Sequence, residues 1–258
     1  MSTTLEIVRI PVLSDNYVWL MREPQSGAVG VVDPAVAAPV LAEAEKRRWR
    51  ITHILNTHHH GDHVGGNLEI KKATGCTIVG NRRDRARIPG LDVEVDDGDR
   101  YRFGEAEAEV VFIPGHTSGH IAYAFREQRA LFCGDTIFAL GCGKMFEGTP
   151  QQFWTSLSRL RALPDDMGVY CAHEYTQSNA RFAVTVETDN RQLMTRRDSI
   201  DAARARGEPT VPSLLGEEKA TNPFLRVDMP SVQRAVGMVG VDPALVFAEV
   251  RHRKDVFR

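Results

Sequence analysis

The segment from Thr57 to His63 concentrates side chains that can bind a metal ion. Four of the chain's nine histidines lie within it, together with one aspartate, in the order THHHGDH. A spacing of the form H-x-H-x-D-H arises by chance in such a chain on the order of one time in a thousand. Its members are His58, His60, Asp62 and His63. Imidazole and carboxylate together favour zinc, iron or manganese over calcium or magnesium, so the segment predicts a transition-metal site rather than a solvated polar loop.

Three later segments each place a metal-capable side chain just after an apolar run. The run VVFIPGH ends at His116, ALFCGD ends at Asp135 and GVYCAH ends at His173. Open α/β sheets carry their functional sites at strand ends, on loops held by a rigid scaffold. We therefore expect these three residues to join the histidine cluster.

Seven residues are then candidate ligands, more than the four of a tetrahedral zinc site. We expect two divalent ions, zinc first with iron or manganese as alternatives, and Asp135 as a shared ligand. Ions about 3.5–4 Å apart share a hydroxide whose parent water has its pKa lowered to about 7. Asp62 and Asp135 would position that hydroxide, so the pattern predicts a hydrolase. The first ion's ligands are His58, His60 and His116, and the second ion's are Asp62, His63 and His173.

The other four histidines receive separate interpretations. His53 lies inside a strand pattern and is expected to be a structural, hydrogen-bonded residue. His59 alternates with two ligands and is expected to point away from the metals. His120 lies four residues after His116, where it either orients a ligand or is a plain loop histidine. His252, near the C-terminus, is expected at the surface.

The elements that position these residues follow from hydrophobic periodicity and turn residues. Strand patterns stop near residue 174, which predicts an α/β domain over 1–173 and a small helical domain over 174–258, with an irregular stretch at 207–224. The expected strands are 5–12, 17–22, 28–32, 51–56, 76–80, 91–95, 108–113, 120–126, 129–133 and 168–172. The expected helices are 39–49, 63–73, 150–162, 176–188, 190–206 and 243–254.

Composition excludes several classes of protein. The net charge of −2 gives no basic excess for nucleic acid, and no apolar run approaches the ~18 residues of a membrane span. The N-terminus shows no signal-peptide pattern, and the four cysteines fit neither a zinc ribbon nor a disulfide scaffold. We therefore expect reduced cysteines and a cytoplasmic protein. Nothing in the pattern compels association, so a monomer is expected.

The histidine motif followed by distant His, Asp and His resembles the metallo-β-lactamase superfamily. That resemblance implies an α/β (α+β) fold, a four-layer αββα sandwich, here with a small C-terminal helical domain packed across the metal cleft. Within the superfamily the chain is similar, nearly end to end, to the glyoxalase II (hydroxyacylglutathione hydrolase) family. The similar segments are LSDNYVWL at 13–20, THHHGDHVGGN at 57–67, GHTSGH at 115–120, CGDTIFALGCGKMFEGT at 133–149, YCAHEYT at 170–176, GEPTVPS at 207–213, NPFLR at 222–226 and VRHRKDVF at 250–257.

The resemblance implies hydrolysis of S-D-lactoylglutathione, a small anionic thioester, to D-lactate and glutathione in methylglyoxal detoxification. It assigns Lys144, Arg251 and Lys254 to the glycine carboxylate of glutathione and Tyr175 to the peptide portion. From the residues alone, Arg251 and Lys254 would be a solvated basic helix end, and Lys144 an exposed loop lysine.

Three alternatives compete with this hypothesis. A mononuclear-iron sulfur dioxygenase acting on glutathione persulfide is the nearest, but the segments NPFLR and VRHRKDVF argue against it. A nuclease should show a basic surface or an RNA-binding insertion, and neither is visible. A metal-dependent binding module without catalysis needs neither an open coordination position nor a second ion.

Phe146 generates a first testable prediction, because some family members carry a tyrosine at this position. The missing hydroxyl removes one hydrogen bond to the tripeptide, which is worth about 0.5–1.5 kcal/mol. The substitution Phe146→Tyr should therefore lower KM for glutathione thioesters, measured by steady-state kinetics. An unchanged KM would refute the idea.

Overall fold

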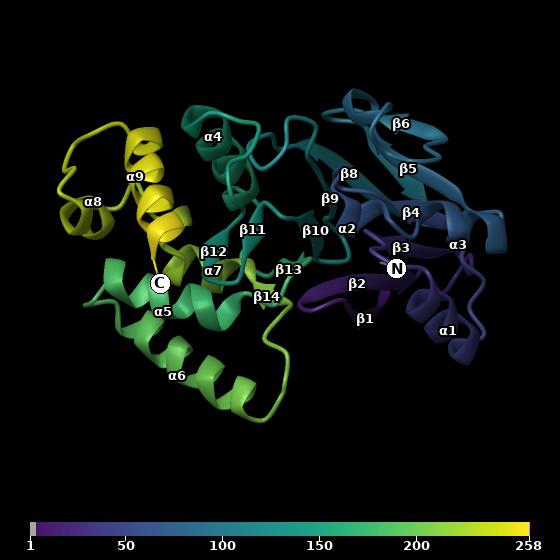
Figure 1. The fold of residues 1–258 in the computed structure, drawn as a ribbon, viewed down its shortest axis with the longest axis horizontal. Coiled ribbons are helices and arrows are strands. Elements are labelled where there is room, and N and C mark those ends of the chain that lie inside the picture. Colours follow the sequence, from purple (N-terminus) through teal and green to yellow (C-terminus); the bar gives the residue numbers. More distant parts are fainter. Residues whose placement is uncertain (1–3, 258) are drawn as a thin grey trace. The chain divides into compact units, whose positions relative to one another are not determined.

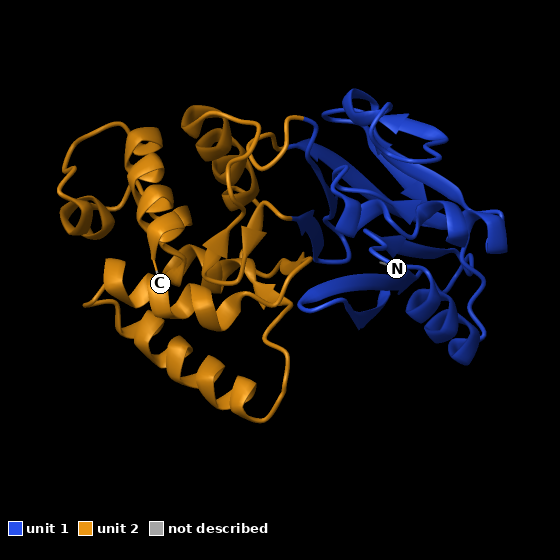
Figure 2. Ribbon diagram, viewed as in Figure 1, with its two compact units in different colours: residues 1–112, 119–134 blue, residues 113–118, 135–258 orange. Residues whose placement is uncertain are grey.

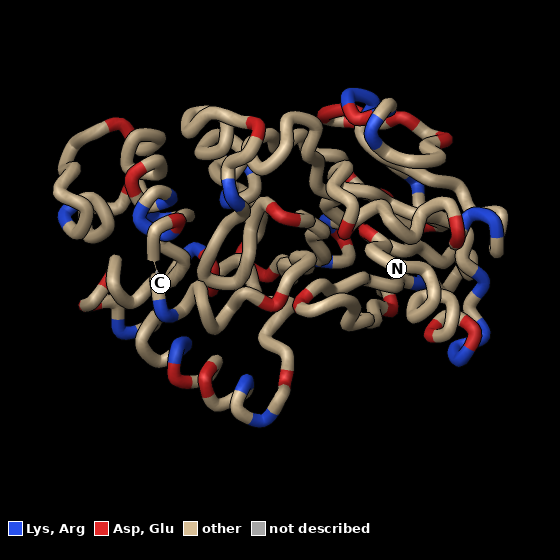
Figure 3. The backbone as a smooth tube through the Cα atoms, in the orientation of Figure 1, with Lys and Arg blue, Asp and Glu red and all other residues tan. Residues whose placement is uncertain are grey.

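The computed structural model describes residues 4–257 as two compact units (Figures 1 and 2). Unit 1 consists of Met1–Phe112 and Gly119–Gly134, and unit 2 of Ile113–Ser118 and Asp135–Arg258. The last change from unit 1 to unit 2 falls after Gly134, which is earlier in the chain than the expected domain boundary at residue 173. Along both units, acidic and basic residues are interspersed, in keeping with the near-neutral charge (Figure 3).

Unit 1 begins with a six-stranded mixed sheet in the order β1-β2-β3-β4-β5-β6. The first three strands pair antiparallel, and β3 to β6 run parallel. Parallel neighbours end at the same edge of the sheet, so the residues that follow β3 and β4 are brought together there. The strands are β1 (Glu6–Val12), β2 (Asn16–Arg22), β3 (Val29–Val32), β4 (His53–Leu55), β5 (Thr77–Asn81) and β6 (Val93–Val95).

Helices cover one face of this sheet. Val40 of α1 and Ile70 of α3 are fully buried in one apolar cluster with Val31, Ile54 and Ile78 of the strands. The helical segments of unit 1 are α1 (Ala38–Arg47), α2 (Gly61–Val64), α3 (Asn67–Thr74) and the 3-10 turn η1 (Arg82–Asp84).

Four antiparallel strands of unit 1, in the order β10-β9-β8-β7, face the first sheet. The Tyr123 hydroxyl donates to the carbonyl oxygens of Asn56 (3.1 Å) and Val79 (3.3 Å), and the His53 ring lies edge-on to Phe103 at 5.4 Å. Unit 1 is thus a sheet-on-sheet sandwich with helices on one outer face. The strands are β7 (Arg100–Phe103), β8 (Ala106–Phe112), β9 (Ile121–Phe125) and β10 (Ala130–Gly134).

Unit 2 is mainly helical. Phe153 of α4 packs against Phe247 of α9, with ring centroids 5.2 Å apart. A capping box of Thr149 and Gln152 starts α4. Two small antiparallel pairs, β11–β12 and β13–β14, complete the unit. Its elements are β11 (Ile137–Phe138), β12 (Gly141–Cys142), α4 (Pro150–Arg161), β13 (Gly168–Cys171), α5 (Thr176–Val186), α6 (Arg191–Ala205), β14 (Ser213–Leu214), α7 (Leu215–Thr221), η2 (Pro223–Leu225), α8 (Pro230–Val236) and α9 (Pro243–Val256).

Side chains of α7 and of the residue that follows it hold the β11–β12 hairpin by its backbone. The Leu140 amide donates to Glu218 Oε2 at 2.9 Å, and Asn222 Nδ2 donates to the carbonyl oxygens of Phe138 (3.1 Å) and Gly141 (2.9 Å). Glu218 and Asn222 are fully buried. Two-residue strands cannot satisfy their own backbone, so these buried polar groups supply the missing partners. They thereby fix the start of the loop that carries Lys144.

The expected strands and helices are all present, with ends that differ by up to a few residues. The expected helix 63–73 is broken into α2 and α3, whose separating residues Gly65 and Gly66 lie against the backbone of 34–37. The stretch 207–224 was expected to be irregular, and this prediction is wrong where it forms β14 and α7. The elements β7, β11, β12 and α8 were not expected either. The missed elements are short, and their residues show no hydrophobic period that separates them from the neighbouring loops. Within the described part of the chain, no helix has the length and apolarity of a membrane span.

Candidate metal centre and substrate site

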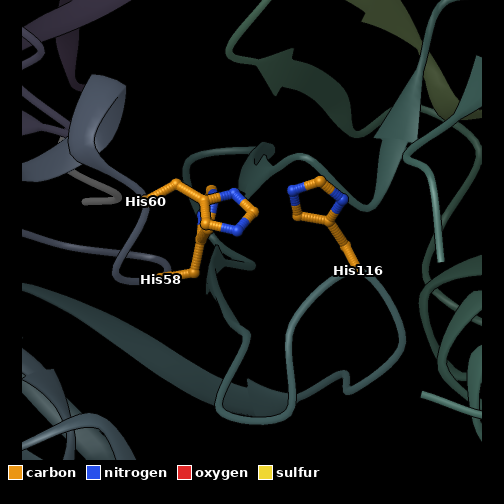
Figure 4. A group of neighbouring side chains, drawn as sticks. All are labelled: His58, His60 and His116. Atoms are coloured by element: carbon orange, nitrogen blue, oxygen red, sulfur yellow. The ribbon is translucent and has the colours of Figure 1, made fainter. Parts of the chain in front are cut away.

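His58 and His60 follow β4 and turn their rings toward each other (Figure 4). His58 Nε2 lies 3.2 Å from His60 Nδ1, and His58 is fully buried. The other nitrogen of His58, Nδ1, lies 3.0 Å from the Thr57 hydroxyl. Two imidazole lone pairs this close repel unless a proton or a cation lies between them. The pair therefore has the donor chemistry of two ligands aimed at one ion.

His63 and Asp62, both on α2, form a second set of donors. His63 is fully buried, and its Nε2 lies 3.6 Å from Asp62 Oδ2. Its Nδ1 lies 3.2 Å from Asp33 Oδ2, at the end of β3. Asn16 Nδ2 donates to Asp62 Oδ2 at 3.0 Å. A carboxylate behind a ligating histidine fixes its ring and its tautomer, and Asp33 is so placed.

Hydrogen bonds from Thr57, at the start of the histidine-rich loop, hold Asp33 in this supporting position. Its two carboxylate oxygens accept from the Thr57 amide at 2.8 Å and the Thr57 hydroxyl at 2.7 Å. Sequence reasoning missed Asp33, although the run VGVVD that ends in it has the same form as the run ending in Asp135. Asn16, in the segment DNY, was missed as a partner of Asp62 because nothing in its local pattern indicates a long-range contact.

In unit 2, His116, Asp135 and His173 are all buried and meet at one carboxylate oxygen. Asp135 Oδ2 lies 3.5 Å from His116 Nε2 and 3.3 Å from His173 Nε2. His116, on the loop after β8 (Figure 4), places Nδ1 2.8 Å from the Lys144 carbonyl oxygen. Because a carbonyl only accepts, the Nδ1 proton is held there and Nε2 presents its lone pair toward Asp135. A carboxylate between two ligand nitrogens is the arrangement that a shared ligand requires.

The remaining histidines occupy four different environments. His59 turns to Asp84, with Nδ1 3.2 Å from a carboxylate oxygen, as the alternating pattern indicated. His120 is buried and stacks on the His58 ring at 4.5 Å, which fits a role in orienting that ligand. His53 packs between strands, and burial lowers its pKa. His252 is exposed.

Tyr175 and Phe146 each contact a histidine of the Asp135 set. Tyr175 stacks on His173 with ring centroids 4.7 Å apart and an interplanar angle of 7°, and it is 38% exposed. Phe146 is 63% exposed and lies edge-on to His116 at 5.3 Å. Both rings therefore present exposed aromatic surface directly beside two of the expected ligands.

The three expected basic residues differ in exposure. Lys144 is exposed on its loop. Lys254 is half-buried, with Nζ 3.2 Å from the Ser178 carbonyl oxygen and hydroxyl, and burial lowers its pKa to about 8, with further lowering by Arg251 and Arg181. Arg251 is only 5% exposed and donates to the Cys142 carbonyl oxygen at 3.0 Å. The solvated basic helix end that the residues alone suggested is therefore wrong for Arg251.

Comparison with known proteins decides the family. A sequence model of the metallo-beta-lactamase superfamily matches residues 13–173, and one of the hydroxyacylglutathione hydrolase C-terminus matches residues 174–257. A hydroxyacylglutathione hydrolase from Methylococcus capsulatus is 60% identical over 254 residues, which cover 98% of this chain and 99% of the relative. One from Rhodospirillum rubrum is 56% identical over 255 residues, which cover 99% and 100%. The chain belongs to the hydroxyacylglutathione hydrolase family. The expected class of enzyme, a thioester hydrolase, is thereby confirmed, and the sulfur dioxygenase alternative is not favoured.

Solved structures with low sequence identity show the fold. ETHE1 from Myxococcus xanthus matches with a TM-score of 0.68 at 23% identity, covering 97% of this chain and 90% of that one. The BLEG-1 B3 metallo-beta-lactamase matches with a TM-score of 0.66 at 17% identity, covering 85% and 99%. The expected metallo-β-lactamase fold is confirmed. Likenesses at these identities carry no information on substrate.

The position of Asp33 behind His63 predicts an effect on metal binding. The substitution Asp33→Asn keeps the size of the side chain but removes its charge, so His63 should bind a divalent ion roughly 10- to 100-fold more weakly. Chelator competition on the purified protein, with metal content by elemental analysis, measures this. Asp165→Asn, at an exposed carboxylate, is the matched control. Equal metal affinity in both variants would contradict the role of Asp33.

Proposed function

We propose that the chain binds two divalent ions, zinc first and iron or manganese as alternatives. The support is the donor set: imidazoles and carboxylates, most of them buried, whose nitrogen and oxygen atoms lie close enough together to hold a metal ion. Asp135 is the shared ligand, because its Oδ2 faces two imidazole nitrogens. The proposed ligands are His58, His60 and His116 for one ion and Asp62, His63 and His173 for the other.

We further propose the substrate class, S-(2-hydroxyacyl)glutathione, chiefly S-D-lactoylglutathione, which is hydrolysed to D-lactate and glutathione. The observation that carries this proposal is the contact of Tyr175 with His173 and of Phe146 with His116. It puts an exposed aromatic surface for a small organic substrate directly beside two proposed ligands. The close relatives that carry the hydrolase's name give the acyl donor as a glutathione thioester.

The protein's own residues orient the reactants. Ions bound by this donor set would supply Lewis acidity toward the thioester carbonyl and a nucleophile at neutral pH. Asp62, oriented by Asn16, and Asp135 accept hydrogen bonds and so hold the attacking water. Water adds to the carbonyl carbon, the carbon–sulfur bond breaks, and the products are a carboxylic acid and a thiol. A thiolate leaves readily, so no dedicated acid is needed.

Basic side chains recognise the glutathione portion. We assign the glycine carboxylate to the charges of Lys144, Arg251 and Lys254, and the peptide portion to the Tyr175 hydroxyl. Lys254 and Arg251 lie on α9, within residues 174–258, which we propose as the substrate-binding domain. We place the reaction in the cytoplasm, as a step of methylglyoxal detoxification by a monomer. The four cysteines are unbridged and buried, which suits a reducing compartment.

The deciding experiment is an assay of metal-loaded protein on S-D-lactoylglutathione, following thiol release. Asp135→Ala should lose more than the roughly 10- to 100-fold typical of supporting residues, because it removes a shared ligand. Asp198→Ala, at an exposed aspartate, should keep the activity. Oxygen uptake on glutathione persulfide is measured in parallel. Absence of thioester hydrolysis, or activity that survives Asp135→Ala, would overturn the proposal.

The lowered pKa of Lys254 predicts how substrate capture depends on pH. Burial and Arg251 disfavour the ammonium form, so its pKa is about 8 and its charge is lost as pH rises through that value. Because kcat/KM reports the free enzyme, kcat/KM for an anionic thioester should fall between about pH 7 and 9. Lys254→Arg keeps its charge over this range and should flatten the profile. Identical profiles for the two proteins would count against Lys254.

A further inference from the structure

The guanidinium of Arg251 is already engaged on three sides. Its Nε and one terminal nitrogen lie 3.0 and 2.9 Å from Asp255 Oδ1, four residues later on α9. The other terminal nitrogen donates to the Cys142 carbonyl oxygen at 3.0 Å. Its carbon lies 5.0 Å from the Phe224 ring centroid. A planar guanidinium held in this way has a set orientation.

The Cys142 carbonyl lies two residues before Lys144, whose own carbonyl accepts from His116 Nδ1 at 2.8 Å. Gly143, between them, lies against the proposed ligands. An added Cβ there would overlap the Asp135 carbonyl oxygen and come within 2.9 Å of His116 Nδ1. The segment Cys142–Lys144 thus connects Arg251 to a metal-ligand histidine within one unit.

A second ion pair on α9, between Arg253 and Glu249, provides a comparison for the pair of Arg251 and Asp255. Arg253 and Glu249 have the same four-residue spacing, with 2.8 Å between Nε and Oε1, but they bond α9 to the carbonyl oxygens of Ala235 and Val236. Exposed helix pairs of this kind contribute little to stability. Arg251 differs because it is buried and bonds to the loop beside His116.

We propose that Asp255 and Arg251 are positioning residues for the hydrolase reaction, which rests on the proposed function. Asp255 sets the angle of the guanidinium, and Arg251 holds the Cys142 carbonyl. The loop then keeps the Lys144 carbonyl on His116 Nδ1 and directs the Lys144 ammonium to the substrate carboxylate. Loss of the Asp255 charge should therefore weaken metal binding at His116 and substrate capture together.

Cys142 offers a readout that is independent of catalysis. Its thiol is 5% exposed and lies 3.8 Å from Arg251, and burial raises its pKa to about 11. Alkylation requires an accessible thiolate, so the closed loop protects this cysteine. If the carbonyl is released from Arg251, the loop opens and the thiol becomes reactive.

The experiment compares Asp255→Asn with Glu249→Gln, which neutralises the partner of Arg253 on the same helix. Asp255 is at the exposed end of α9, so its variant should fold. In Asp255→Asn we expect roughly 10- to 100-fold weaker metal affinity by chelator competition, with a lower kcat/KM. Alkylation of Cys142 by iodoacetamide, located by peptide mass spectrometry, should be at least about tenfold faster. Glu249→Gln should match the unchanged protein, and Asp255→Glu should restore part of the protection.

The outcomes separate this inference from the proposed function. If Asp255→Asn lowers only the melting temperature, with alkylation and metal affinity equal to those of Glu249→Gln, the positioning role is overturned. If the unchanged protein does not hydrolyse the thioester, the proposed function fails. Metal affinity and Cys142 alkylation would then still test whether the pair holds the loop.

Discussion

Buried lone pairs are the constraint on which the rest of this structure depends. His58 and His60 bring two imidazole nitrogens within 3.2 Å, and Asp135 brings one carboxylate oxygen within 3.5 Å of two more. Polar groups removed from water in this way cost several kcal/mol unless protons or cations compensate. Each set of donors therefore favours a positive charge beside it, which the proposed divalent ions would supply together with the coordination chemistry a hydrolase needs.

Two supporting groups set the direction in which the imidazole nitrogens point. Asp33 faces His63 Nδ1, and the Lys144 carbonyl faces His116 Nδ1, so in both cases the opposite nitrogen is directed to the centre. The two supports differ in origin. Asp33 lies at the end of β3 in the rigid first sheet, whereas Lys144 is on a loop held by helices. Metal binding is thus linked to the helical part of the chain through a backbone carbonyl.

Residues of the helical C-terminal segment hold that loop in place. Glu218 and Asn222 satisfy the hairpin backbone before the loop, and Arg251 bonds to Cys142 at its start. The same segment therefore carries the proposed carboxylate-binding lysine, Lys254, and the groups that shape the ligand loop. Two of the proposed carboxylate-binding residues and the contacts that hold the loop beside His116 therefore lie in the same C-terminal segment.

Most strands and helices, and the resemblance to the family, could be predicted from the sequence, because apolar periodicity and the H-x-H-x-D-H spacing are local signals. The sequence also indicated His116, Asp135 and His173, since each follows an apolar run. Only the tertiary structure revealed the supports. Asp33 lies 24 residues before Thr57 and Asp255 acts through Arg251 on a loop 109 residues away, and such pairings leave no local pattern. The burial of Arg251 could not be predicted either, because the local sequence near a helix end is the same whether a basic side chain faces water or a backbone carbonyl.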